Sequence, residues 1–137
     1  MIDNTFTLIS RIDGEIRRFI TEELAAEGIA DIVPSHGAII MEPMNELARR
    51  IDRTPQTVTC LIKKLVNTGY VTTGKSSGDS RVTMAALTEQ GRHLASVLQR
   101  ISEKIYERQY FGIPEDDIPI LRGALMKMHS NFAEKEL

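Results

Sequence analysis

The sequence has no tryptophan, a single cysteine and no long uninterrupted apolar run. One thiol, Cys60, excludes a disulfide within the chain and is typical of a protein from a reducing compartment. No stretch approaches the roughly 18–20 apolar residues that a membrane span needs. Charged residues also interrupt the first twenty positions, where a secretory signal would need an apolar core. We therefore expect a cytoplasmic protein without a membrane segment.

Residues for catalysis or metal binding lack any recognisable spacing. His36, His93 and His129 are far apart and have no adjacent cysteine or carboxylate in a zinc-ligand pattern. Gly74 and Gly78 lie in an expected hairpin, whereas a phosphate-binding loop joins a strand to a helix. The serines of the Gly/Ser loop, Ser76, Ser77 and Ser80, have no paired histidine in the sequence. We expect neither an enzyme nor a bound metal or other cofactor.

Charge is distributed unevenly along the chain, although the net charge is only −2. The segment from Met44 to Arg81 holds seven basic and three acidic residues, and the remainder holds ten basic and sixteen acidic residues. A basic block in an acidic frame is typical of a protein that presents one face to a polyanion. Chance clustering on a solvated face is the alternative.

Apolar periodicity predicts four helices in the first half of the chain. An apolar stripe at three- and four-residue steps predicts a long helix over residues 4–26. A short helix over residues 34–40 and a third, MNELARRI, over residues 44–51 follow it. After a short turn, Pro55 is typical of the first position of a fourth helix, which Gly69 ends.

The second half predicts a hairpin and two more helices. Two β-capable runs, 70–73 and 81–87, flank a loop rich in glycine and serine. Thr88 is a typical cap for a long helix that ends near Gly112, and a last helix must carry Pro119 in or before its first turn. The order is not an alternating βα pattern, so we expect a mainly α fold with a small β-hairpin wing.

A helix, a short turn and a second helix with a polar outer face form a helix-turn-helix unit. The second helix of such a unit fits the major groove of B-DNA, with its first residues nearest the base edges. Lysines further along reach phosphates, which set affinity rather than sequence preference. The expected base contacts are Pro55, Gln56, Thr57, Thr59 and Cys60, and the expected phosphate contacts are Lys63 and Lys64.

The hairpin that follows extends the same surface. We expect Lys75, Ser76 and Ser77 to meet the neighbouring DNA backbone and Arg81 to enter the minor groove, where a narrow groove attracts arginine. Phosphates repel a carboxylate, so Asp79 is expected to stabilise the wing by holding Arg81 or the loop.

These motifs together resemble the MarR family of winged helix-turn-helix regulators. The resemblance is firm from Ser35 to Arg92 and looser elsewhere, and it rests on four matching pieces: MNELARRI, TPQTVTCLIKKLVNTGYV, GDSRV and LTEQGR. Residues 79–81 match the family's Asp-x-Arg wing pattern, and residues 87–91 match its Leu-Thr-x-x-Gly. Cys60 and Thr73 stand where the family often has arginine, which reduces positive charge on the DNA face.

The resemblance implies one MarR-like domain over residues 1–137 that works as a homodimer. Residues 34–88 would form the winged helix-turn-helix, and residues 1–33 and 89–137 the dimerisation helices. A two-fold dimer predicts pseudo-palindromic duplex sites with half-site centres roughly 34 Å apart. The long first helix also needs another helix over its apolar stripe, but the terminal helices of one chain covering each other is the monomeric alternative.

The family commonly represses transcription and is relieved by small phenolic or anionic ligands bound where dimer helices meet the winged part. The resemblance therefore implies a small aromatic or anionic effector, although aromatic and methionine residues at helical spacing are usually core. The candidate lining residues are Ile12, Ile16, Arg17, Phe19, His36 and Met41.

Two alternatives stay open. Winged helices also bind proteins, so the chain could be a protein–protein interaction module without direct DNA binding. Cys60 could have a redox role, but peroxide-sensing relatives carry their reactive cysteine in the first helix, which here has none.

Overall fold

The structure, a computed structural model, describes residues 2–32, 49–50, 56–75, 78–79 and 81–133, and for 49–50 and 56–59 only the backbone. The chain divides into two units, Met1–Glu103 and Lys104–Leu137. The predicted helix over 34–40 lies outside the described residues, as do residues 44–48 and 51 of the third predicted helix.

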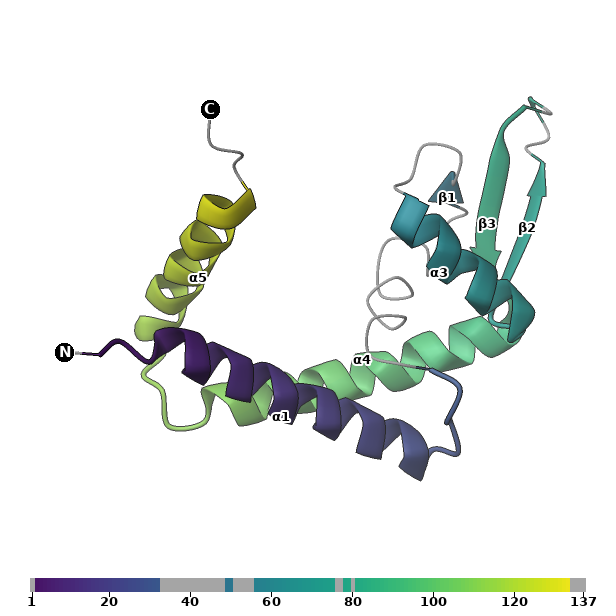
Figure 1. Cartoon of the computed structure of the whole chain (residues 1–137). Helices are drawn as coiled ribbons and strands as arrows, with labels where there is room; N and C mark the ends of the chain where they lie inside the picture. Colours follow the sequence, from purple (N-terminus) through teal and green to yellow (C-terminus); the bar gives the residue numbers. More distant parts are fainter. Residues whose placement is uncertain (1, 33–48, 51–55, 76–77, 80, 134–137) are drawn as a thin grey trace. The chain divides into compact units, whose positions relative to one another are not determined.

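The first unit begins with the long helix α1, Thr5–Ala26 (Figure 1). The Thr5 backbone N–H donates to the carboxylate of Asp3 at 2.8 Å, which satisfies a helix donor that would otherwise lack a partner. At the other end the backbone turns at Gly28, whose φ of 76° lies in the left-handed region. The predicted bounds of this helix are confirmed.

A small antiparallel sheet holds three described strands: β1 (Arg49–Arg50), β2 (Val71–Lys75) and β3 (Thr83–Leu87). Their order is β1-β3-β2, with Val71 opposite Leu87 and Lys75 opposite Thr83 in the hairpin. The predicted hairpin is therefore confirmed.

The predicted helix over residues 44–51 is wrong at Arg49 and Arg50, which form β1. Arg49 pairs with Ala85 and Arg50 with Met84 of β3. This short strand gives backbone partners to the edge of β3 that β2 leaves open, and such pairing outweighs the helical preference of the local sequence.

Helix α3, Gln56–Asn67, leads into the sheet, and α4, Glu89–Tyr110, follows it. Side chains from these elements, from the end of α1 and from the segment after α1 form the apolar core of the first unit. Its buried members among the described residues are Leu24, Ile32, Ile62, Leu65, Tyr70, Val71, Ala85, Leu87, Leu94, Ala95, Val97, Leu98 and Ile101.

Thr88 joins the end of α3 to the start of α4. Its hydroxyl donates to the carbonyl of Gly69 at 2.6 Å and accepts from the backbone N–H of Gly91 at 3.1 Å. Its own N–H donates to the carbonyl of Tyr70 at 3.1 Å. The predicted N-cap therefore also fixes the residues between α3 and β2.

Gly91 makes this junction possible because it leaves room for the neighbouring backbone. A Cβ atom at this position would lie 2.0 Å from the carbonyl oxygen of Tyr70, and that oxygen belongs to the main chain. The glycine of the Leu-Thr-x-x-Gly pattern is therefore required by close packing of α4 on the start of β2.

The second unit contains the end of α4 and the helix α5, Asp117–Ala133. Gly112 turns the chain between them with a φ of 78°, and Pro119 lies in the first turn of α5, where the sequence predicts it. The rings of Tyr106 and Tyr110 meet edge to face, with centroids 5.0 Å apart.

Within the described ranges, no helix is both long and apolar enough to cross a membrane. The predicted fold class, mainly α with a small β-hairpin wing, is confirmed.

Replacing Gly91 with alanine should lower the free energy of unfolding by at least about 2 kcal/mol, because the new methyl group forces backbone apart. Urea denaturation followed by circular dichroism measures this loss. In the matched control, Gly14→Ala, the added methyl group meets nothing within 4 Å in a helix interior, so stability should rise by about 0.5–1 kcal/mol. Equal stability of Gly91→Ala and the wild type would contradict the close-packing account.

Candidate nucleic-acid interface

Helix α3 separates apolar and polar side chains onto opposite sides. Ile62 and Leu65 are buried, with exposed fractions of 1% and 0%, and Leu61 is half-buried. Lys63 and Lys64 are exposed. The apolar side therefore fixes the helix on the core of the first unit, while a cationic side faces outward.

The sequence-predicted residues on α3 fall on its described backbone or exposed side. Cys60 is exposed and free. Gln56, Thr57 and Thr59 lie in the first turn and a half of the helix, where the backbone alone is described. Pro55 lies outside the described residues.

The end of α3 is held by several hydrogen bonds. The Thr68 hydroxyl donates back to the carbonyls of Lys64 and Leu65, at 3.0 and 3.2 Å. Gly69, with a φ of 89°, then turns the chain into β2. The orientation of α3 is thus coupled to the sheet.

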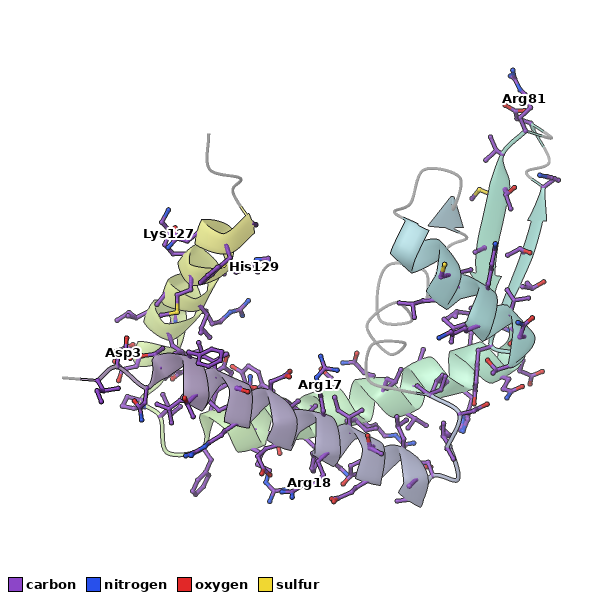
Figure 2. All side chains as sticks on the ribbon, in the orientation of Figure 1. Asp3, Arg17, Arg18, Arg81, Lys127 and His129 are labelled. Carbon is purple, nitrogen blue, oxygen red and sulfur yellow. The ribbon has the colours of Figure 1, made fainter. Side chains whose placement is uncertain are left out.

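The hairpin carries its predicted cations toward its free end. Lys75 is exposed at the end of β2, and its ammonium donates to the Thr83 hydroxyl across the hairpin at 3.0 Å. Arg81 stands at the tip, with 90% of its side chain exposed (Figure 2). Ser76 and Ser77 lie outside the described residues.

Asp79 binds Arg81 through both its backbone and its side chain. The Arg81 backbone N–H donates to Asp79 Oδ1 at 2.9 Å, and its guanidinium Nε donates to the same oxygen at 3.2 Å. The backbone carbonyl of Asp79 also accepts from the N–H of Val82 at 3.1 Å. The carboxylate thus orders the turn and directs the arginine.

The electrostatics of this surface are one-sided. From Gln56 to Leu87 the sequence has four basic residues and one acidic residue, Asp79, whose carboxylate contacts Arg81. An exposed surface of this charge attracts a polyanion such as a phosphate backbone.

The candidate effector residues lie along α1 where they are described. Ile12 is exposed, while Ile16 and Phe19 are half-buried. Arg17 is exposed and pairs with Asp13 one turn earlier, at 3.0 Å. His36 and Met41 lie outside the described residues. Across the described ranges, no three His, Cys, Asp or Glu side chains are grouped as metal ligands.

Sequence reasoning missed a polar contact behind this surface. The hydroxyl of Tyr70 donates to Asp31 Oδ1 at 2.8 Å, across 39 positions of sequence. Burial raises the pKa of the Tyr70 phenol above its ordinary value, and the Asp31 carboxylate raises it further. An aromatic residue after a helix-ending glycine is a visible signal, but nothing local identifies its partner.

Comparisons with known proteins find transcription regulators of similar sequence and similar fold. No family model matches the chain. The HTH-type transcriptional regulator SarZ of Staphylococcus haemolyticus is 33% identical over 88 residues, which are 64% of this chain and 58% of the relative. SarZ of Staphylococcus aureus is 32% identical over 96 residues, covering 67% and 64%. The chain thus spans less than two thirds of the curated relatives it matches.

Solved structures agree over nearly the whole chain. A SlyA-like transcription regulator from Listeria monocytogenes has a TM-score of 0.73 at 18% identity, covering 97% of this chain and 91% of that one. FabT of Streptococcus pneumoniae, solved in complex with DNA, has a TM-score of 0.72 at 20% identity, covering 93% and 94%. MarR has a TM-score of 0.68 at 15% identity, covering 97% and 95%. This chain has the MarR-type winged-helix fold. The resemblance to the MarR family read from the sequence motifs is confirmed.

Replacing Asp79 with alanine should loosen the Arg81 side chain, because the carboxylate is its hydrogen-bond acceptor. Nitrogen-15 relaxation of Arg81 Nε measures this change as a lower heteronuclear NOE. Unfolding free energy should change by no more than about 0.5 kcal/mol, since an ion pair with an exposed guanidinium contributes little.

The matched variant Asp79→Asn keeps an oxygen acceptor for the Arg81 backbone N–H but loses the charge. It should loosen the guanidinium while leaving the backbone amide ordered. An Arg81 Nε that is as ordered in Asp79→Ala as in the wild type would disprove the role of the carboxylate.

Proposed function

We propose that this MarR-type chain is a sequence-specific, DNA-binding transcription regulator that acts as a homodimer on pseudo-palindromic duplex sites. The observation that carries the proposal is the division of α3, which buries Ile62 and Leu65 and exposes Lys63 and Lys64. A helix held from behind with a cationic outer side is the element that enters a major groove.

In this proposal the first part of α3 reads bases. Gln56 pairs with adenine, the methyl groups of Thr57 and Thr59 meet thymine methyls, and Pro55 and Cys60 complete the contact surface. Lys63 and Lys64 bind phosphates and fix the register. Cysteine in place of a frequent family arginine at position 60 lowers the charge, so sequence preference depends more on the neutral side chains.

The hairpin extends the contact beyond the major groove. Lys75, Ser76 and Ser77 meet the adjacent backbone, and Arg81 enters the minor groove, whose negative potential is strongest where it is narrow. Asp79 holds the Arg81 guanidinium before binding, which lowers the conformational entropy lost on association.

The similar proteins support DNA binding by this chain. Both SarZ proteins are HTH-type transcriptional regulators, and FabT was solved with DNA bound. A fold shared with a DNA-bound protein supports DNA contact by α3 and the hairpin, and the cations of α3 and the wing supply the matching chemistry.

Exposed apolar side chains on both units support a homodimer. On α1, Phe6 and Ile12 are 82% and 55% exposed. On the second unit, Ile120, Met126 and Phe132 are 70%, 67% and 92% exposed. Large apolar side chains exposed along helices in this way are typical of a subunit interface. Residues 1–33 and 89–137 thus form the dimerisation helices, and residues 34–88 the DNA-binding part.

Regulation by a small aromatic or anionic effector completes the proposal. The effector would bind among Ile12, Ile16, Arg17, Phe19, His36 and Met41 and relieve repression caused by occlusion of a promoter. Arg17 supplies a cation for an anionic ligand, although it also pairs with Asp13. The proposal needs no cofactor and assigns no catalytic residue.

The rival function is a winged-helix module that binds a protein partner. The net charge of −2 for the whole chain favours this protein-binding alternative. Affinity for duplex DNA distinguishes the two functions. A module that binds only proteins does not bind DNA and therefore releases no counterions from it.

Affinity for duplex DNA should fall steeply as salt rises, because bound cations release phosphate counterions. Fluorescence anisotropy at several salt concentrations gives the slope of log affinity against log salt. Lys64→Ala should reduce the magnitude of this slope by about 1.8 in a dimer, since each lost phosphate contact contributes about 0.9.

Arg81→Ala should weaken binding by about 10-fold or more on a selected duplex, because each subunit loses a minor-groove contact. The control is Arg18→Ala, an exposed arginine of α1 that pairs with Glu15, and its affinity should equal that of the wild type. Absence of duplex binding by the wild type at low salt would favour the protein-binding module instead.

Analytical ultracentrifugation at micromolar concentration should give a molar mass twice the 15.4 kDa of the subunit. Phe6→Asp and Leu125→Asp should shift the mass toward the monomer, because a carboxylate in an apolar interface loses its hydration. Lys127→Asp places the same carboxylate on α5 at an exposed polar position and should leave the dimer intact. A wild-type monomer at this concentration would refute the homodimer.

A further inference from the structure

Tyr70 lies where the end of α3, the start of β2 and the start of α4 meet. Its backbone N–H donates to the Leu65 carbonyl in the last turn of α3, at 2.9 Å. Its carbonyl accepts from Thr88 at 3.1 Å and lies against Gly91. Because the main chain is held on both sides, the phenol of Tyr70 moves with the end of α3.

The acceptor of this phenol moves with α1. Asp31 comes five residues after the last residue of α1, and the turn between them is hydrogen-bonded back to the helix. The N–H groups of Gly28 and Ile29 donate to the carbonyls of Ala25 and Leu24, both at 2.9 Å. Ile32, directly after Asp31, is buried in the core.

The hydrogen bond between the two residues is strong for its setting. The Tyr70 side chain is only 4% exposed, and its hydroxyl donates to a carboxylate oxygen at 2.8 Å. Charged acceptors form stronger hydrogen bonds than neutral ones. A tyrosine phenol carries its proton at neutral pH, and burial raises the pKa of Tyr70 further above that range.

A second side-chain contact of α1, also between described residues, is weaker. Glu27, at the end of α1, pairs with Arg100 of α4 at 3.5 Å, and both side chains are about half exposed. Exposed ion pairs contribute little. The hydrogen bond from Tyr70 to Asp31 therefore constrains the angle between α1 and α3 more than this ion pair does.

We propose that Tyr70 and Asp31 are positioning residues: their hydrogen bond fixes the recognition helix α3 relative to α1 and thereby sets the half-site spacing that the dimer accepts. The inference rests on the proposed function, because it takes α1 as a dimerisation helix and α3 as the DNA reader. One base pair advances DNA by about 3.4 Å, so a small rotation at this joint changes the favoured spacing.

The test compares binding to duplexes that differ only in half-site spacing. The probes are a duplex selected by the wild type from a random pool and versions with one base pair added or removed between the half-sites. Tyr70→Phe and Asp31→Ala should reduce the preference for the selected spacing at least about fivefold, as expected for losing a hydrogen bond to a charged group. Asp31→Asn keeps an oxygen acceptor and should retain the preference.

Matched controls remove the same groups elsewhere. Tyr106→Phe loses a hydroxyl from an exposed tyrosine, and Asp116→Ala loses an exposed carboxylate. Both should keep the spacing preference of the wild type. If Tyr70→Phe weakens binding to all three probes equally, the residue only stabilises the fold, and the positioning role is overturned.

A second measurement needs no DNA. Amide hydrogen exchange in the free protein should accelerate about tenfold in the segments 29–32 and 65–70 of Tyr70→Phe and Asp31→Ala, with Asp31→Asn and Tyr106→Phe like the wild type. Unchanged exchange would overturn the joint itself. If the wild type binds no duplex while exchange responds as expected, the proposed function fails and the joint between α1 and α3 is supported.

Discussion

The approach of Gly91 to the carbonyl of Tyr70 is the constraint on which the rest of the first unit depends. It brings the start of α4 against the main chain between α3 and β2, closer than any side chain would permit. Thr88 uses the same closeness to bond Gly69, Tyr70 and Gly91 at once. The end of α3, the base of the hairpin and the N-terminus of α4 thus form one joint, and that joint determines where α3 and the wing face.

The proposed function depends on which sides of α3 and of the hairpin this joint leaves exposed to solvent. Ile62 and Leu65 bury one side of α3, so Lys63 and Lys64 are exposed as a consequence of the same packing. At the far end of the hairpin, Asp79 pairs with Arg81 and offsets one positive charge, while Lys63, Lys64 and Lys75 keep the surface cationic. Stability and electrostatics are therefore divided between opposite sides of the same elements, which suits a protein that binds a polyanion without rearranging its core.

Local chemistry was enough to predict most of this fold. Gly28, Gly69 and Gly112 adopt left-handed backbone at three predicted helix ends, and Thr88 caps α4 as its residue type suggests. The strand at Arg49–Arg50 was not predicted, because its partner residues lie 36 and 34 positions away and its own residues favour helix. The hydrogen bond from Tyr70 to Asp31 was not predicted either, because the two residues are 39 positions apart. Of the predicted site, the cations on α3 and the wing are exposed, whereas the roles of individual residues toward DNA bases depend on a partner that sequence patterns do not contain.

Entry of the exposed side of α3 into the groove of duplex DNA can be measured directly through Cys60. This sole thiol is exposed on α3, so an iron chelate that cuts nearby DNA can be attached to it. We expect strand cuts on a bound duplex in two clusters about one helical turn apart, on the tract that unlabelled protein protects. A bound duplex that is protected but not cut near Cys60 would contradict it.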